Sequence, residues 1–189
     1  MTVTNTLDWG DHIGNCINKA KQCIGWISRS VISRSPSVML NIYKTLIRPH
    51  LEYCVQVWSP YPRYGNWETI KSIENVQRMF TRLIDGIGLL SYEERLHKLN
   101  LTTLLERRAR GDLIETYRIV SGIANYGSNL LAVSRNGHLT LPSGKGYSTK
   151  YDFLSGRVVK FWNKLPASVQ QAGSVDCFKA KLKAYKIPF

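Results

Sequence analysis

The sequence predicts a mainly α-helical protein with one short strand or hairpin, and three observations support this fold class. Apolar residues recur at three- and four-residue steps, the capping pattern Ser/Thr-x-x-Glu begins at Ser91 and Thr103, and Pro or Gly stands where periodic stretches end. With 189 residues, 43% of them hydrophobic, the chain can build a buried core. Three segments are expected: a helical segment at 7–60, a helical linker at 61–122 and a basic C-terminal extension at 123–189.

Two helices are predicted in the first segment. The first covers 11–34, where Asp8 and Asp11 can cap its start, and it buries Ile13, Ile17, Ala20, Ile24, Ile27 and Val31. The second begins at Ser35-Pro36, because Pro suits a first turn, and buries Val38, Met39, Ile42, Tyr43, Leu46 and Ile47. Pro49 is expected to kink or end it, and residues 51–58 then form a helix or a short buried segment.

The linker is predicted to contain three helices. The first, at 66–84, buries Trp67, Ile70, Ile73, Phe80, Leu83 and Ile84, and it stops at the Gly-rich residues 85–88. A short helix follows from Ser91 to Leu99. A longer one begins at Thr103, reaches about Val120 and ends at Gly122.

The last segment starts with a stretch of weak helical periodicity at 123–150, where a short strand is expected at 138–141. A helix at 151–164 should bury Phe153, Leu154, Val158, Phe161 and Trp162. A final helix, capped by Ser174, should bury Phe178, Leu182 and Tyr185 and expose its lysines.

Net charge points to an acidic partner. The chain has 26 Lys and Arg against 13 Asp and Glu, and residues 123–189 alone hold ten basic and two acidic side chains. Such a field attracts polyanions, so RNA or DNA is the first candidate partner and an anionic membrane face the second, while a basic surface without such a partner is the simplest alternative.

No run of about 20 uncharged apolar residues and no secretory signal is present. The four scattered cysteines indicate a reducing compartment, so we expect an intracellular protein, nuclear or cytoplasmic and not secreted.

Patterns typical of catalysis are absent from the sequence. There is no Gly-x-Ser-x-Gly, Walker A or Rossmann glycine pattern, and no adjacent Asp pair or Asp-x-Asp that could hold two metal ions. His12 and Cys16 lie one helical turn apart, but Cys23 is too far along the helix to join them. We therefore predict packing cysteines, capping aspartates, no metal and no cofactor.

Three groups of residues are candidates for contacts with nucleic acid. Arg107, Arg110 and Arg118 fall within about an 80° arc of one helix, although ion pairs with Glu106 and Glu115 are an equal alternative. The second group is the C-terminal lysines: Lys160, Lys164, Lys179, Lys181, Lys183 and Lys186. The third is an aromatic and basic loop that could stack on bases, although core packing is favoured for it: Trp58, Tyr61, Arg63 and Tyr64.

Six motifs in order carry a resemblance to a known family. They are LNIYKTLIRPHLEYC at 40–54, VQVWSP at 55–60, LSYEERL at 90–96, ERRARGDLIETY at 106–117, FLSGRVVKFWNKLP at 153–166 and SVDCFK at 174–179. The series resembles the region that follows the catalytic palm in reverse transcriptases of jockey-type non-LTR retrotransposons, which are LINE-like elements. The match runs from about Leu7 to Lys186.

This resemblance implies that 7–60 correspond to the polymerase thumb, with Lys19, Lys21, Arg29 and Arg34 as contacts to an RNA–DNA hybrid, and that an upstream palm region is a second partner. In that family the whole polypeptide is an RNA-directed DNA polymerase that copies element RNA at a nicked chromosomal target. The family's Tyr/Phe-Ala-Asp-Asp motif and its endonuclease domain are missing from this sequence. We therefore expect a truncated open reading frame that binds RNA or DNA without polymerising. The alternatives are a helical protein-interaction module and a decayed element copy with no selected role.

Overall fold

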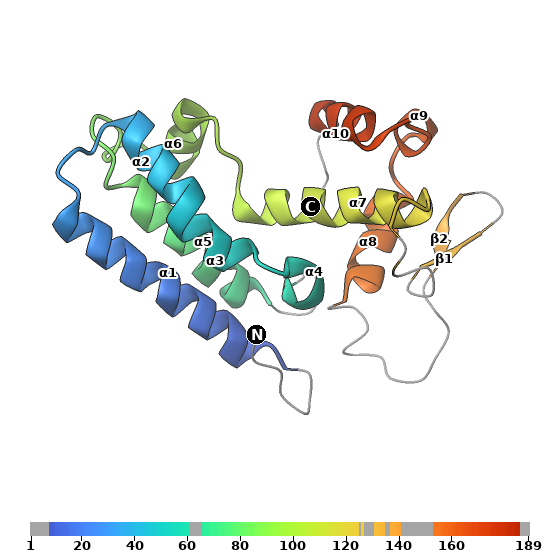
Figure 1. Cartoon of the computed structure of the whole chain (residues 1–189), viewed down its shortest axis with the longest axis horizontal. Coiled ribbons are helices and arrows are strands. Elements are labelled where there is room, and N and C mark those ends of the chain that lie inside the picture. The colour runs from blue at the N-terminus through green and yellow to red at the C-terminus, as the bar shows by residue number, and fades with distance from the viewer. Residues whose placement is uncertain are drawn as a thin grey trace. The chain divides into compact units, whose positions relative to one another are not determined.

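A computed structural model of the chain describes residues 8–60, 66–124, 126, 131–134, 137–140 and 153–185. This described part is mainly helical with one small antiparallel hairpin, which confirms the predicted fold class (Figure 1). The chain divides into two compact units, Met1–Leu105 and Glu106–Phe189. These units do not coincide with the segments 7–60, 61–122 and 123–189, and the roles assigned to those segments stay predictions.

The first unit is a set of helices around one apolar core. Its elements are α1 (Gly10–Ser30), α2 (Pro36–Ile42), the π-helix η1 (Tyr43–Ile47), α3 (Arg48–Glu52), α4 (Val55–Trp58), α5 (Trp67–Thr81) and α6 (Tyr92–Leu99). Helix α1 packs against η1, α3 and α5, as can be followed in Figure 1. The predicted stripe of α1 from Ile13 to Ile27 is buried in this core, which confirms the helical periodicity.

Pro49 does not end the second helix, because a turn of π-helix precedes it. Residues 43–47 form η1, and Pro49 stands in the first turn of α3, where a missing backbone N–H costs little. Buried side chains then follow at strict four-residue steps: Met39, Tyr43, Ile47, Leu51 and Val55. In a regular α-helix each such step would drift by about 40°, and the wider π-turn corrects part of this drift.

Two burial predictions in this region are wrong. Val38 and Leu46, expected in the core, are 39% and 46% exposed, because the buried stripe runs through Met39, Tyr43 and Ile47. Trp67 was also predicted to be buried, but it is the first residue of α5 and remains 49% exposed.

A tight turn connects α5 to α6. Gly86 has φ of +75°, in the left-handed region that favours glycine. At Gly88 a Cβ would lie 2.7 Å from the backbone oxygen of Arg82, so only glycine fits there. Helix α6 then starts with the predicted capping box: the Ser91 hydroxyl accepts from the Glu94 N–H, and the Glu94 carboxylate accepts from the Ser91 N–H at 2.8 Å.

The second unit holds most of α7 (Leu104–Val120), then β1 (Ala132–Val133), β2 (Leu139–Thr140), α8 (Leu154–Trp162), α9 (Ala167–Gln170) and α10 (Val175–Ala184). The strands pair antiparallel with Ala132 opposite Thr140, so the predicted strand is confirmed over 139–140, and Leu141 lies outside the described residues. Gly122 has φ of +68° just beyond α7, as its predicted role as a stop requires.

The core of this unit is aromatic. Tyr117 of α7 stacks on Phe178 of α10 with ring centroids 4.4 Å apart, and Trp162 of α8 lies 6.1 Å from the same ring. The Ser174 hydroxyl accepts from the N–H of Cys177, which confirms the predicted cap of α10. Helix α9 is a single turn that the sequence did not indicate.

Candidate nucleic-acid interface

The basic residues predicted on the first helix do not form one face. Lys19, Lys21 and Arg29 are exposed on α1, but Lys19 and Lys21 point about 160° apart because each residue turns the helix by about 100°. Arg34 lies beyond the end of α1, is half-buried and donates to the backbone oxygen of Ser28 at 2.9 Å. These four cations therefore cannot all contact the same phosphate backbone.

The arginine arc of α7 is formed in part. Arg107 and Arg118 are exposed, while Arg110 is half-buried. Arg118 lies 3.7 Å from Glu115, so the alternative of local ion pairs holds for this arginine. A pair of this kind at the surface contributes little to stability and is screened by salt, and Arg118 can exchange it for a phosphate contact.

A buried ion pair that the sequence analysis missed joins α7 to α8. Arg157 donates from Nε and Nη2 to the two carboxylate oxygens of Asp112 at 3.0 and 3.1 Å, and both side chains are at most 7% exposed. Burial raises the pKa of Asp112, whereas the charges of Arg157 and Arg108 act in the opposite direction. The bidentate geometry requires an ionised carboxylate, so Asp112 and Arg157 compensate one another's charge.

The C-terminal lysines have different surroundings. Lys160 and Lys164 are exposed at the end of α8, and Lys183 is exposed on α10. The Lys179 ammonium lies 3.1 Å from Asp176, and that of Lys181 donates to the backbone oxygen of Ser168 at 2.6 Å. Lys186 lies outside the described residues. The ends of α8 and α10 are neighbours, because the Tyr185 hydroxyl donates to the backbone oxygen of Lys164 at 3.3 Å.

Within the aromatic and basic loop, Trp58 has the core-packing role that was favoured. Trp58 is 1% exposed and its indole N–H donates to the backbone oxygen of Tyr53 at 2.7 Å, so it is a core residue. Tyr61, Arg63 and Tyr64 lie outside the described residues.

Three further arginines of the first unit come together without having been predicted. Arg78 on α5 and Arg82, the residue that follows the helix, are exposed one turn apart, and Arg95 of α6 is only 3% exposed. The Arg95 guanidinium donates to Thr81 Oγ1 at 3.1 Å and to the Leu90 backbone oxygen at 2.6 Å. Burial and the nearby charge of Arg82 lower the pKa of Arg95. The spacing Arg78-x-x-x-Arg82 on an amphipathic helix was the signal that could have found the two exposed members.

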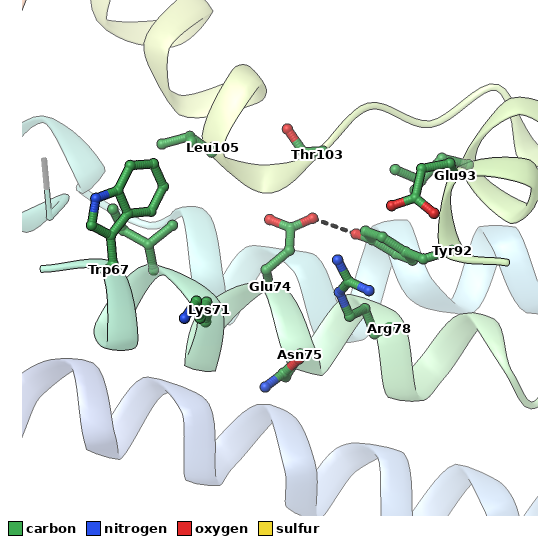
Figure 2. Close-up of a pocket in the computed structure, with 11 residues that line it drawn as sticks. Trp67, Lys71, Glu74, Asn75, Arg78, Tyr92, Glu93, Thr103 and Leu105 are labelled. Atoms are coloured by element: carbon green, nitrogen blue, oxygen red, sulfur yellow. Dashed lines mark hydrogen bonds between the residues drawn. The ribbon is translucent and has the colours of Figure 1, made fainter. Parts of the chain in front are cut away.

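A pocket of about 440 Å³ lies beside these arginines, between α5, α6 and the start of α7 (Figure 2). Its floor is the carboxylate of Glu74, which accepts from the Tyr92 hydroxyl and, at 2.9 Å, from the backbone N–H of Leu104. Burial and the neighbouring Glu74 raise the pKa of Tyr92, so its hydroxyl remains a donor. The Arg78 guanidinium lies 4.1 Å from the centroid of the Tyr92 ring, a cation–π distance.

The two possible metal ligands that lie one helical turn apart, His12 and Cys16, contact each other. Cys16 Sγ lies 3.5 Å from His12 Nε2, and the described residues hold no group of three or more His, Cys, Asp or Glu placed to bind a metal ion. Asp8 has the predicted capping role, because its Oδ1 accepts from the N–H of Gly10 at 2.9 Å.

Comparison with protein-family models, curated proteins and solved structures finds no match to this chain. Among the described residues, no helix combines the length and apolar character that crossing a bilayer requires. The functional argument therefore depends on the chemistry of the side chains described above and on the motifs of the sequence.

Proposed function

We propose that the chain binds RNA, DNA or an RNA–DNA hybrid by cationic contacts to the phosphate backbone, as the non-catalytic thumb and extension region of a non-LTR reverse transcriptase would do. Polymerisation is not included, because the sequence contains no Asp-Asp pair of the kind that holds the catalytic metal ions in that family. The six ordered motifs support the family context, and the distribution of charge supports the mode of binding.

The observation that carries the proposal is the exposure of Lys160, Lys164 and Lys183. Residues 106–189 hold fourteen basic and five acidic side chains, a net charge of +9. Asp112 is used inside the unit by Arg157, and no described carboxylate lies within ion-pair distance of these three lysines. An uncompensated positive surface of this kind favours a polyanion.

The type of side chain indicates how a duplex would be bound. Lysine is a flexible point charge, so contacts from it give affinity without reading sequence. An RNA–DNA hybrid has an A-like shape, whose backbone can be recognised through shape and phosphate position. Binding should therefore depend on duplex form and salt and depend little on base sequence.

The palm region of a polymerase is the second partner included in this proposal. Val38 and Leu46 are exposed apolar side chains on α2 and η1, in the segment that resembles a thumb. A palm packed on this side would cover them and remove apolar area from water. Co-purification with a palm segment should be lost in a Val38→Asp, Leu46→Asp variant, and unchanged co-purification would contradict this part.

A charge-neutralising variant tests the main proposal. Lys160→Gln with Lys164→Gln should weaken binding of a hybrid hairpin and lower the slope of log K against log salt by about 2, since two phosphate contacts are removed. The matched control is Lys44→Gln with Lys98→Gln, which removes the same charge from exposed lysines of the first unit. Equal loss in both variants would show that net charge alone attracts the duplex.

A further inference from the structure

One side of α5 presents a continuous set of residues suited to a nucleic-acid strand. Trp67, Lys71, Asn75, Arg78 and Arg82 are all exposed, and their spacing places them within about 80° of one another around the helix axis. The helix buries its opposite side, with Ile73, Val76 and Phe80 in the core. This side of α5 therefore faces away from the core, where Lys71 pairs with Glu68 at 2.8 Å and Arg78 lies over the Tyr92 ring.

The pocket beside this set has two walls that can stack on a flat ring. Figure 2 shows Trp67 on one side of the pocket and the Arg78–Tyr92 pair on the other, with Glu74 between them. The Trp67 side chain is 49% exposed, so its ring is accessible. The Arg78 guanidinium lies over the Tyr92 ring, and its planar form suits stacking against a base. The volume of about 440 Å³ is that of a small-ligand site.

Both signs of charge line the pocket, with Glu74 and Glu93 as the carboxylates and Lys71 and Arg78 as the cations. The Glu74 carboxylate on the floor would repel a phosphate, although a base can donate an amino hydrogen to a carboxylate oxygen. Arg78 is followed one turn later by Arg82, and Arg82 lines a second hollow of about 580 Å³ together with Arg34 and Asp85. Arg82 and Arg34 thus offer phosphate contacts beyond the pocket, at positions that a single mononucleotide in the pocket does not need.

We propose that this α5 surface is a site for single-stranded RNA or DNA: one unpaired base enters between Trp67 and the Arg78–Tyr92 pair, and the neighbouring phosphates lie on Arg78, Arg82 and Arg34. The inference rests on the proposed nucleic-acid binding but concerns the first unit and a different form of the ligand. Stacking on aromatic rings is tolerant of sequence, because every base has a π-face.

The experiment compares two exposed tryptophans. A single-stranded octanucleotide containing 2-aminopurine is titrated with the full chain and with the variants Trp67→Ala, Arg78→Gln and Trp26→Ala, the last being a control because Trp26 is 58% exposed on α1. Trp67→Ala should weaken binding at least about fivefold and abolish the quenching of 2-aminopurine that stacking causes, and Arg78→Gln should also weaken binding. Trp26→Ala should change neither quantity. Far-ultraviolet circular dichroism checks that each variant is folded.

Each other outcome has a distinct meaning. Equal behaviour of Trp67→Ala and Trp26→Ala, or no binding of the octanucleotide while the hybrid hairpin still binds, overturns the single-strand site and leaves the proposed function intact. If neither the octanucleotide nor the hybrid hairpin binds, the single-strand site and the proposed function are both wrong. If AMP binds as tightly as the octanucleotide, the proposed contacts with the neighbouring phosphates of a strand are wrong, and the site is a mononucleotide pocket.

Discussion

Replacing the buried carboxylate of Asp112 should destabilise the second unit selectively. In Asp112→Asn, the guanidinium of Arg157, which is 3% exposed, loses the carboxylate that compensates its charge. Breaking a buried pair of this kind costs about 3–5 kcal/mol. At about 0.05–0.15 kcal/mol per residue, a unit of 84 residues has a total stability of about 4–13 kcal/mol, so the loss is a large fraction of it.

Hydrogen exchange measured by mass spectrometry can localise this effect. Amides of α8 and α10 should exchange at least about 100-fold faster in Asp112→Asn, the factor that corresponds to about 3 kcal/mol, whereas amides of α1 and α5 should be unchanged. The control is Asp176→Asn, which removes a surface pair with Lys179 and should cost less than about 1 kcal/mol.

A double variant distinguishes loss of charge balance from loss of packing. Asp112→Leu combined with Arg157→Met replaces both charges by apolar side chains and should regain much of the protection, although Arg108 stays in place. An Asp112→Asn variant as stable as Asp176→Asn would refute the reasoning, because the pair would then contribute no more than an exposed one.

Two further predictions concern the first unit. Gly88→Ala should destabilise it by about 1–3 kcal/mol in urea unfolding, because the new Cβ would lie 2.7 Å from the Arg82 backbone oxygen, whereas Gly25→Ala, which meets nothing within 4 Å on α1, should stabilise it slightly. His12 is 8% exposed between Trp9 and Trp58, and burial lowers its pKa, so its contribution to stability is present above about pH 6.5 and is lost as the pH falls through the lowered value. Unfolding free energies at pH 7.5 and 5.5 should therefore differ less in His12→Phe than in the unsubstituted chain, and an equal difference would contradict this assignment.

Local signals predicted the helices well because they act within a few residues. The capping box at Ser91, the cap at Ser174 and the stop at Gly122 all depend on backbone groups one turn away, and each has its expected role. Burial in the second helix was harder to predict, because the π-turn at 43–47 changes the periodicity on which the prediction of Leu46 depended.

The candidate site was less predictable because its residues meet across long stretches of sequence. Asp112 and Arg157 are 45 positions apart, and no periodic pattern pairs them. Arg78 lies on Tyr92, which belongs to another helix, so the amphipathic spacing of α5 shows that Arg78 is exposed but not what it contacts. Charge composition, by contrast, indicated a basic surface without help from tertiary structure, because lysines such as Lys160 rarely enter a core.

The most direct test of the account is the salt dependence of binding between the purified chain and an RNA–DNA hybrid hairpin. The proposal predicts binding at 50 mM salt and a linear fall of log K with log salt, with a slope of about −3 or steeper if at least four phosphates are contacted. The three exposed lysines of the second unit and Arg118 would supply four such contacts. Absence of binding at low salt, or an affinity that does not change between 50 and 200 mM, would contradict the claim that this chain holds nucleic acid by its charge.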